Sequence, residues 1–236
     1  DAKLTKETGG SGMMRGSFGP VADGVHLPKE PFFSDNSSYS ASVPMILSST
    51  FNEMSPSRTD AKLESITLDE VKEKLKQPTP TSAGMGNKAD AIVEAYSKAF
   101  PNAKPIEIWS MISSNRTRVI EAAEAKVKQP APVYLAWFGW QPPLFDNRMR
   151  AFHCLDISFW FANTDRMLTH TGGGKRPRLL AEKMSDALLQ FMRTGNPNCK
   201  SLPEWKAYSS EKGETMILDD VCGFKNDPDR EARKLL

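Results

Sequence analysis

Residues 133–138 read Val-Tyr-Leu-Ala-Trp-Phe, and this short run carries the clearest fold signal in the chain. β-branched and aromatic side chains favour strands over helices. Pro130 and Pro132 open the run, as is typical of a strand that begins after a turn. We therefore predict a buried strand at residues 133–138.

A second apolar run, Ser-Val-Pro-Met-Ile-Leu at residues 42–47, is bounded by polar residues and fits another buried strand better than a helix of that length. Helix signals separate the two runs. Thr67 followed three residues later by Glu70 is a capping-box pattern, which predicts that a helix begins there. Apolar residues three and four positions apart predict two more helices, at about residues 90–99 and 114–128.

The strongest helix signal lies after the second predicted strand, where we predict a long amphipathic helix. Gly195 and Pro197 mark its end, as is typical of helices. Its apolar face consists of Leu179, Leu180, Met184, Ala187, Leu188 and Phe191. Strands that alternate with helices predict an α/β fold, with a mainly parallel sheet flanked by helices. We find no repeat and no linker composition that would divide the 236 residues into separate domains.

The distribution of charge and the length of the apolar stretches argue against nucleic-acid and membrane partners. Thirty-one Lys and Arg residues balance 29 Asp and Glu residues, and they are spread along the chain instead of forming a basic stripe. Nucleic acid is therefore not an expected partner. No apolar stretch approaches the ~20 residues of a spanning helix, so we expect no membrane partner either.

Metal and cofactor motifs are also weak. Cys154, Cys199 and Cys222 lie far apart without a Cys-x-x-Cys pair, and the pattern His-Cys-x-Asp at 153–156 lacks a second ligand cluster. Gly-Gly-Gly-Lys at 172–175 is not a phosphate loop, because Thr169 stands where the first glycine is required, so we interpret these glycines as a flexible connection. We expect no metal and no cofactor.

Two side chains sit where an α/β sheet presents catalytic groups, beyond the carboxyl ends of strands. His153 lies on the loop after the second predicted strand, and Glu53 follows the first. A carboxylate there could orient an imidazole for catalysis. The residues alone also allow a structural histidine and a solvated loop acid. We interpret the other two histidines, His26 and His170, as loop residues.

The segments around both residues resemble the type-B carboxylesterases, the cholinesterase-like family of α/β-hydrolases. Ser-Ser-Thr-Phe-Asn-Glu-Met at 48–54 is similar to that family's Gly-Thr-Asn/Thr-x-Asp-Glu-Gly motif, which places the triad acid at Glu53. Residues 151–163, Ala-Phe-His-Cys-Leu-Asp-Ile-Ser-Phe-Trp-Phe-Ala-Asn, resemble its histidine segment, which places the triad base at His153. Ser48, Met54 and Ala162 stand where the family usually has glycine.

Flanking segments support the same resemblance in the correct order. Residues 20–28 are similar to Pro-x-x-Asp-Gly-x-x-x-Pro. Residues 191–198 and 202–205 match a Phe-x-Arg-x-Gly-Asn-Pro and a Pro-x-Trp feature. The resemblance thus covers nearly the whole chain and implies an α/β-hydrolase fold.

The serine elbow Gly-x-Ser-x-Gly does not occur in the chain: Ser11 lacks one required glycine, and Ser17 has Arg15 in place of the first. In the resembled family the order is serine, acid, histidine, so the elbow and the oxyanion hole precede everything seen here. The resemblance therefore implies that residues 1–236 are the C-terminal portion of a single hydrolase domain. We expect a companion N-terminal segment to carry the nucleophile.

The resemblance implies hydrolysis of carboxylic esters through an acyl-serine intermediate, with a small-molecule ester as substrate. An alternative from the same family is an adhesion or binding module that has lost catalysis. The aromatic residues Trp137, Phe138, Trp140 and Phe152 are candidates for the wall of a substrate pocket, although core packing also explains them. The residues do not decide the compartment, and the resemblance favours a secreted or periplasmic one.

Overall fold

The structure is a computed structural model that describes residues 24–25, 40–78 and 84–236. The chain divides into two units, residues 1–41 and residues 42–236, and every element described below belongs to the second. His26 and most of the segment 20–28 lie outside the described residues.

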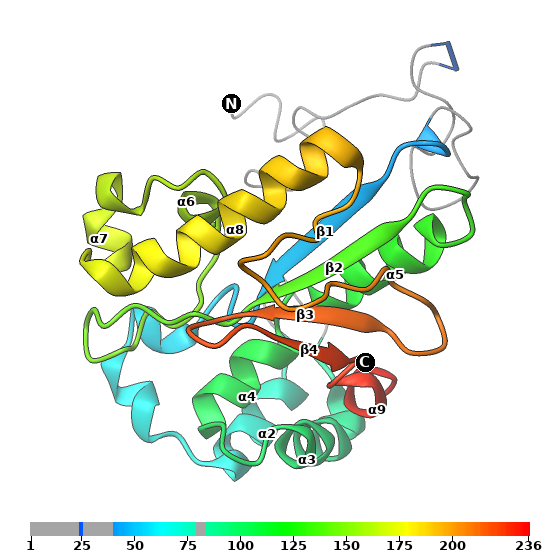
Figure 1. Ribbon diagram of the computed structural model, residues 1–236. Helices are drawn as coiled ribbons and strands as arrows, with labels where there is room; N and C mark the ends of the chain where they lie inside the picture. Colours follow the sequence, from blue (N-terminus) through cyan, green and yellow to red (C-terminus); the bar gives the residue numbers. More distant parts are fainter. Residues whose placement is uncertain (1–23, 26–39, 79–83) are drawn as a thin grey trace. The chain divides into compact units, whose positions relative to one another are not determined.

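A four-stranded sheet forms the centre of the second unit, in the order β1-β2-β3-β4 (Figure 1). β1 (Met45–Thr50), β2 (Val133–Phe138) and β3 (Glu214–Leu218) run parallel, while β4 (Gly223–Asn226) pairs antiparallel with β3. All six residues of β2 are buried because the strand lies between two neighbours and is covered on both faces. The expected α/β fold with a mainly parallel sheet is confirmed.

β2 has the predicted bounds, but the first strand was predicted three residues too early. The ladder begins where the Met45 N–H donates to the carbonyl of Pro132, at 3.0 Å, and it ends with Thr50 opposite Phe138. Pro44 has no N–H to donate, so it cannot take a ladder position of this kind. Ser48, Ser49 and Thr50 are polar, yet their backbones pair with residues 136–138, so the strand extends beyond its apolar run.

Helices form where the local signals predicted them, and four further helices in the described part of the chain were not predicted. Thr67 and Glu70 make the predicted capping box, in which the Thr67 N–H donates to the Glu70 carboxylate at 2.8 Å. The longest of these unpredicted helices is α4, which begins at Pro105, and the other three have four residues each. The helices are α2 (Leu68–Lys76), α3 (Ala89–Ala99), α4 (Pro105–Ile112), α5 (Arg116–Lys126), α6 (Ile157–Trp160), α7 (Leu168–Thr171), α8 (Lys175–Thr194) and α9 (Arg230–Arg233), with 3-10 turns η2 (Pro56–Arg58), η3 (Ala61–Ser65), η4 (Gly86–Lys88) and η5 (Thr164–Arg166).

α8 ends at Gly195, whose φ of 75° lies in the left-handed region. A Cβ at this position would stand 2.8 Å from Cγ of Pro44, so both the backbone conformation and the close contact require glycine. The contact places the end of α8 against the start of β1.

Helices cover both faces of the sheet. On one face, alternate β2 side chains, including Tyr134 and Phe138, pack with Leu180 and Met184 of α8. On the other face, Leu135 and its neighbour Val133 pack with Ile120 and Ala123 of α5. α2, α3 and α4 build a separate apolar core that also takes in Ala232 of α9. The sheet and this helical cluster meet near the carboxyl ends of the strands, where Phe51 packs against both cores.

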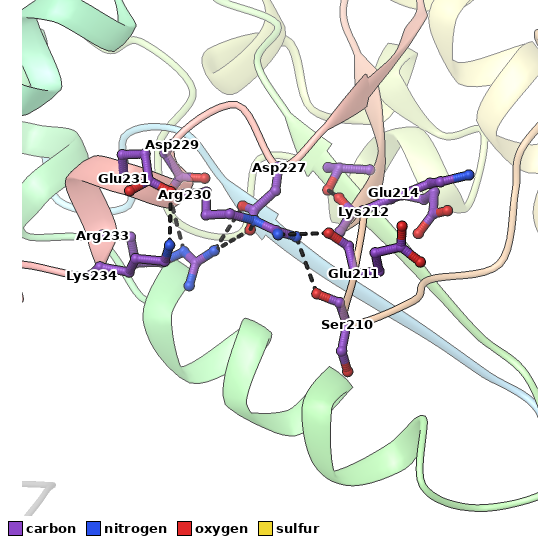
Figure 2. A network of polar contacts seen from close by, with 12 residues as sticks. Ser210, Glu211, Lys212, Glu214, Asp227, Asp229, Arg230, Glu231, Arg233 and Lys234 are labelled. Carbon is purple, nitrogen blue, oxygen red and sulfur yellow. Dashed lines mark hydrogen bonds and ion pairs between the residues drawn. The ribbon is translucent and has the colours of Figure 1, made fainter.

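A buried ion network joins α9 to the sheet (Figure 2). Asp227 accepts hydrogen bonds from Arg233 at 2.6 Å and from Arg230 at 2.9 Å. Burial is the largest single influence and raises the pKa of Asp227, but the hydrogen bonds and positive charges of Arg233, Arg230 and Arg116 together outweigh it and hold the pKa below its usual value. Deeper in the protein, Arg116 of α5 contacts the fully buried Asp229 at 3.4 Å and lies 4.4 Å over the Trp137 ring.

We predict that Arg116→Met destabilises the protein by about 3–5 kcal/mol, because it leaves Asp227 and Asp229 buried with less compensating charge. The matched control is Lys234→Met, which removes an exposed cation paired with Glu231 at 2.8 Å and should cost less than about 1 kcal/mol. Denaturant unfolding of the full-length protein measures both. Equal losses for the two variants would contradict the importance of the buried network.

Candidate active site

The structure brings Glu53 and His153 together, although they are 100 positions apart. Glu53 follows β1 by three residues, and His153 ends the long loop that leaves β2. The Glu53 carboxylate oxygen Oε2 lies 2.7 Å from His153 Nδ1, and the His153 backbone N–H donates to the Glu53 carbonyl at 3.0 Å. A further backbone bond, from Asn52 to Ala151 at 3.1 Å, extends the pairing of the two segments. The predicted contact is therefore present in both side chain and backbone.

The two side chains differ in exposure in the way that an acid–base pair requires. The Glu53 side chain is 11% exposed, and its second oxygen accepts the Thr50 N–H at 3.3 Å. The His153 side chain is 56% exposed. A carboxylate at Nδ1 favours the tautomer with the proton on Nδ1, which leaves the lone pair on Nε2. Among the described residues, no group bonds Nε2, so this atom is free to accept a proton.

Arg150 fixes the loop that carries His153. Its guanidinium forms two hydrogen bonds with the Glu64 carboxylate, at 2.7 and 2.8 Å, and its Nε lies 3.4 Å from Glu107. The Ser57 hydroxyl accepts a third bond at 2.8 Å. The hydrogen bonds from Arg150 lower the pKa of Glu64 to about 2. Three residues before the candidate base, the loop is thus tied to η3 and α4.

Asp156 is a second carboxylate close to the pair. Its carboxylate accepts the Ser48 hydroxyl at 3.3 Å and the Trp160 indole N–H at 3.2 Å. Burial raises the pKa of Asp156, and the nearby Glu53 carboxylate adds to that rise. Ser48, one of the departures from the usual glycines, is therefore bonded in place by this acid.

The other two departures from glycine are also visible. Met54 is exposed and adds an apolar side chain beside Glu53. Ala162 has a φ of 51°, which a residue with a Cβ adopts only at some cost. The backbone thus keeps a conformation that glycine favours, although the residue has changed.

The four aromatic residues considered as pocket walls belong to the interior. Trp137, Phe138, Trp140 and Phe152 are at most 2% exposed, as core packing requires. The Phe152 ring lies 5.7 Å from the ring of His170, which sits in α7 and not in a loop as predicted. The glycines at 172–174 connect α7 to α8, in agreement with their interpretation as a connection.

Within the described ranges, no three His, Cys, Asp or Glu side chains gather closely enough to hold a metal ion. All three cysteines are unpaired. No described helix is long and apolar enough to cross a membrane.

Comparisons with known proteins identify the family and the fold of this chain. The model of the carboxylesterase family matches residues 3–232. The chain is 27% identical over 227 residues to the para-nitrobenzyl esterase of Bacillus subtilis (strain 168), which covers 93% of this chain and 43% of that protein. It is 25% identical over 219 residues to the phenmedipham hydrolase of Pseudarthrobacter oxydans, covering 86% and 41%.

Solved structures show the same fold. An esterase from Clostridium hathewayi, described as able to hydrolyse aliphatic aromatic polyesters, has a TM-score of 0.62 and 24% identity, with 81% of this chain and 37% of that chain covered. A structure of PNB esterase has a TM-score of 0.54 and 24% identity, covering 82% and 38%. This chain spans about two fifths of the length of the relatives it matches.

We predict that the Glu64–Arg150 pair makes the free energy of unfolding depend on pH in the acid range. The pKa of Glu64 falls from 4.5 to about 2 on folding, so the stabilisation is complete above about pH 5 and is lost as the pH falls from 4.5 towards 2. Glu64→Gln should therefore lower Tm near neutral pH, and the difference from the wild type should shrink towards pH 2. Thermal unfolding across this range tests it.

The control for this titration is Glu73→Gln, because Glu73 is an exposed carboxylate paired with Lys76 at 2.7 Å. Its Tm should follow the wild type at every pH. If the difference in Tm between Glu64→Gln and the wild type stays constant from neutral pH to pH 2, the ionised Glu64–Arg150 pair is not what fixes the loop.

Proposed function

Because this chain belongs to the carboxylesterase family, we propose that it hydrolyses carboxylic esters through an acyl-serine intermediate, together with a serine supplied by a companion segment. The single observation that carries the proposal is the 2.7 Å contact between Glu53 and Nδ1 of an exposed His153 whose Nε2 is open. That arrangement is what a serine hydrolase requires of its acid and base.

In the proposed reaction, His153 Nε2 takes the proton of the serine hydroxyl while the serine oxygen attacks the ester carbonyl. The leaving alkoxide then receives that proton from His153, and an acyl-serine remains. Water repeats the sequence: His153 removes its proton, the hydroxide attacks the acyl carbon, and the serine oxygen leaves and recovers the proton. Glu53 stays ionised throughout and stabilises the imidazolium.

Two features support a companion segment as the source of the serine. The chain lacks Gly-x-Ser-x-Gly and spans about two fifths of its relatives. In addition, among the described residues β1 pairs with β2 alone, and its first residues are only half-buried. An apolar hollow of about 260 Å³ borders this strand, lined by Ile46, Ser48, Ile157, Trp160, Phe161 and Leu188.

We propose that the companion segment adds a parallel strand at the open edge of β1. Unpaired backbone groups at a strand edge favour the addition of another strand, and the apolar hollow favours side chains over water. A serine at the carboxyl end of the added strand would lie at the same sheet edge as His153.

A binding module without catalysis is the alternative. It has no chemical need for an acid and a base held at hydrogen-bond distance, so the intact pair favours hydrolysis. The relatives are named as a para-nitrobenzyl esterase and a phenmedipham hydrolase. We therefore propose small aromatic esters as the first substrates to assay.

We predict that His153→Ala in the full-length protein lowers kcat for p-nitrophenyl acetate by about 10⁴–10⁶-fold, because it removes the group proposed to move the proton. Glu53→Gln should fold normally and lower kcat by about 10⁴-fold through loss of tautomer control. KM should change far less. The matched control is His170→Ala, which removes the other described histidine and should cost less than about tenfold. Near-normal turnover by His153→Ala would refute its role as the base.

We further predict that residues 1–236 alone neither hydrolyse p-nitrophenyl esters nor react with a fluorophosphonate, since they contain no serine elbow. Expression with a companion segment that carries Gly-x-Ser-x-Gly should restore both properties. A companion segment with that serine changed to alanine should bind without restoring either. Fluorophosphonate labelling of the 236-residue chain by itself would place the nucleophile within it and contradict this proposal.

A further inference from the structure

A cavity of about 300 Å³ lies beside the site, where the sheet meets the helical cluster of α2, α3 and α4. Neither Glu53 nor His153 lines it. Its walls come from the residues after β1, from the connection between α3 and α4, from α4 and from the residues after β2. The lining residues that matter here are Phe51, Asn52, Phe100, Glu107, Met111 and Gln141.

The polar feature of this cavity is Asn52. The residue is 2% exposed, and within the described part of the chain its side-chain amide makes no hydrogen bond. Its backbone is fixed, because the Asn52 N–H donates to the Ala151 carbonyl at 3.1 Å. Buried amides in proteins nearly always have partners, and an amide has both donors and an acceptor to satisfy. The cavity is therefore lined by an unpaired amide, which offers both donors and an acceptor to a ligand.

The other polar groups of the cavity are already balanced in charge. Glu107 accepts the Gln141 side-chain amide at 3.3 Å and the Lys104 backbone N–H at 2.8 Å, and its carboxylate lies 3.4 Å from Arg150 Nε. Gln141 keeps its own carbonyl oxygen as a further acceptor. Among the described residues that line the cavity there is no Lys, Arg or His to neutralise an anionic ligand, so the cavity favours neutral molecules.

The rest of the wall is apolar and suits a flat or branched body. The rings of Phe51 and Phe100 pack edge to face with centroids 6.5 Å apart, and the buried Met111 lines the same cavity. The volume lies at the lower end of small-molecule sites, which typically combine apolar walls with a few placed polar groups. Both properties are present here.

We propose that this cavity is a binding site for a small neutral molecule with an aromatic or branched alkyl body and a carboxamide group. The carboxamide carbonyl accepts from the Asn52 amide, and its N–H donates to the Asn52 or Gln141 carbonyl oxygen. The aromatic body packs against Phe51 and Phe100. The site is separate from the ester-hydrolysing pair, so binding does not depend on the proposed function.

Isothermal titration of the full-length protein with benzamide tests the proposal. Saturable binding is expected, and Asn52→Leu should weaken it about tenfold, the effect of about one hydrogen bond. Ala103→Trp, which places a large side chain into the cavity from the α3–α4 connection, should weaken binding by more than tenfold. The matched control is Ser113→Trp, at an exposed position that does not line the cavity, and it should bind within about twofold of the wild type.

Benzoate distinguishes a neutral site from a general apolar hollow and should bind at least about tenfold more weakly than benzamide. Thermal unfolding of each variant verifies that it is folded, and the Ala103→Trp result stands if Asn52→Leu does not fold. Absence of benzamide binding, equal binding of benzoate, or unchanged binding by both cavity variants would overturn the proposal. Ester turnover, measured on the same preparations, is an independent readout, so loss of hydrolysis with intact benzamide binding refutes only the proposed function.

Discussion

The parallel pairing of β1 with β2 is the constraint on which the rest of the site depends. Because Met45 lies opposite Val133 and Thr50 opposite Phe138, both strands end at the same edge of the sheet. The pairing continues past the strands, where the Phe51 N–H donates to the Phe138 carbonyl at 2.9 Å. A shift of one residue would turn the side chains of β1 to the opposite face and separate Glu53 from His153. Glu53 and His153 thus meet because of backbone register, and the side-chain bond between them follows from it.

The environment then gives each member of the pair a different task. Glu53 is held by the end of β1 and largely buried, so its carboxylate is fixed beside Nδ1. His153 is exposed, but the loop that carries it is not free, because Arg150 ties that loop to Glu64 and Glu107. Multiple hydrogen bonds from one guanidinium give direction as well as strength. The imidazole of His153, the proposed base, therefore faces solvent from a fixed support, which is the arrangement that proton transfer at a defined atom requires.

The sequence predicted those parts of the fold that depend on local signals. β2, the capping box at Thr67 and the end of α8 at Gly195 were all predictable from their own residues. β3 and β4 were not, because Glu214 and Thr215 are polar and their burial comes only from pairing and long-range contacts. The contact between Glu53 and His153 was predictable from strand ends together with the family resemblance. Arg150 and Glu64, 86 positions apart, carried no local signal that they would pair, and the burial of Asn52 depends on helices that arrive later in the chain.

The most direct measurement is a crystal structure of the full-length protein after reaction with a fluorophosphonate. We predict a phosphonylated serine on a segment that extends the sheet beside β1. The serine oxygen should lie within hydrogen-bond reach of His153 Nε2, about 3 Å, while Glu53 remains at Nδ1. A phosphonylated residue remote from His153, or a His153 ring turned away from Glu53 in that structure, would contradict the proposed roles of these two residues.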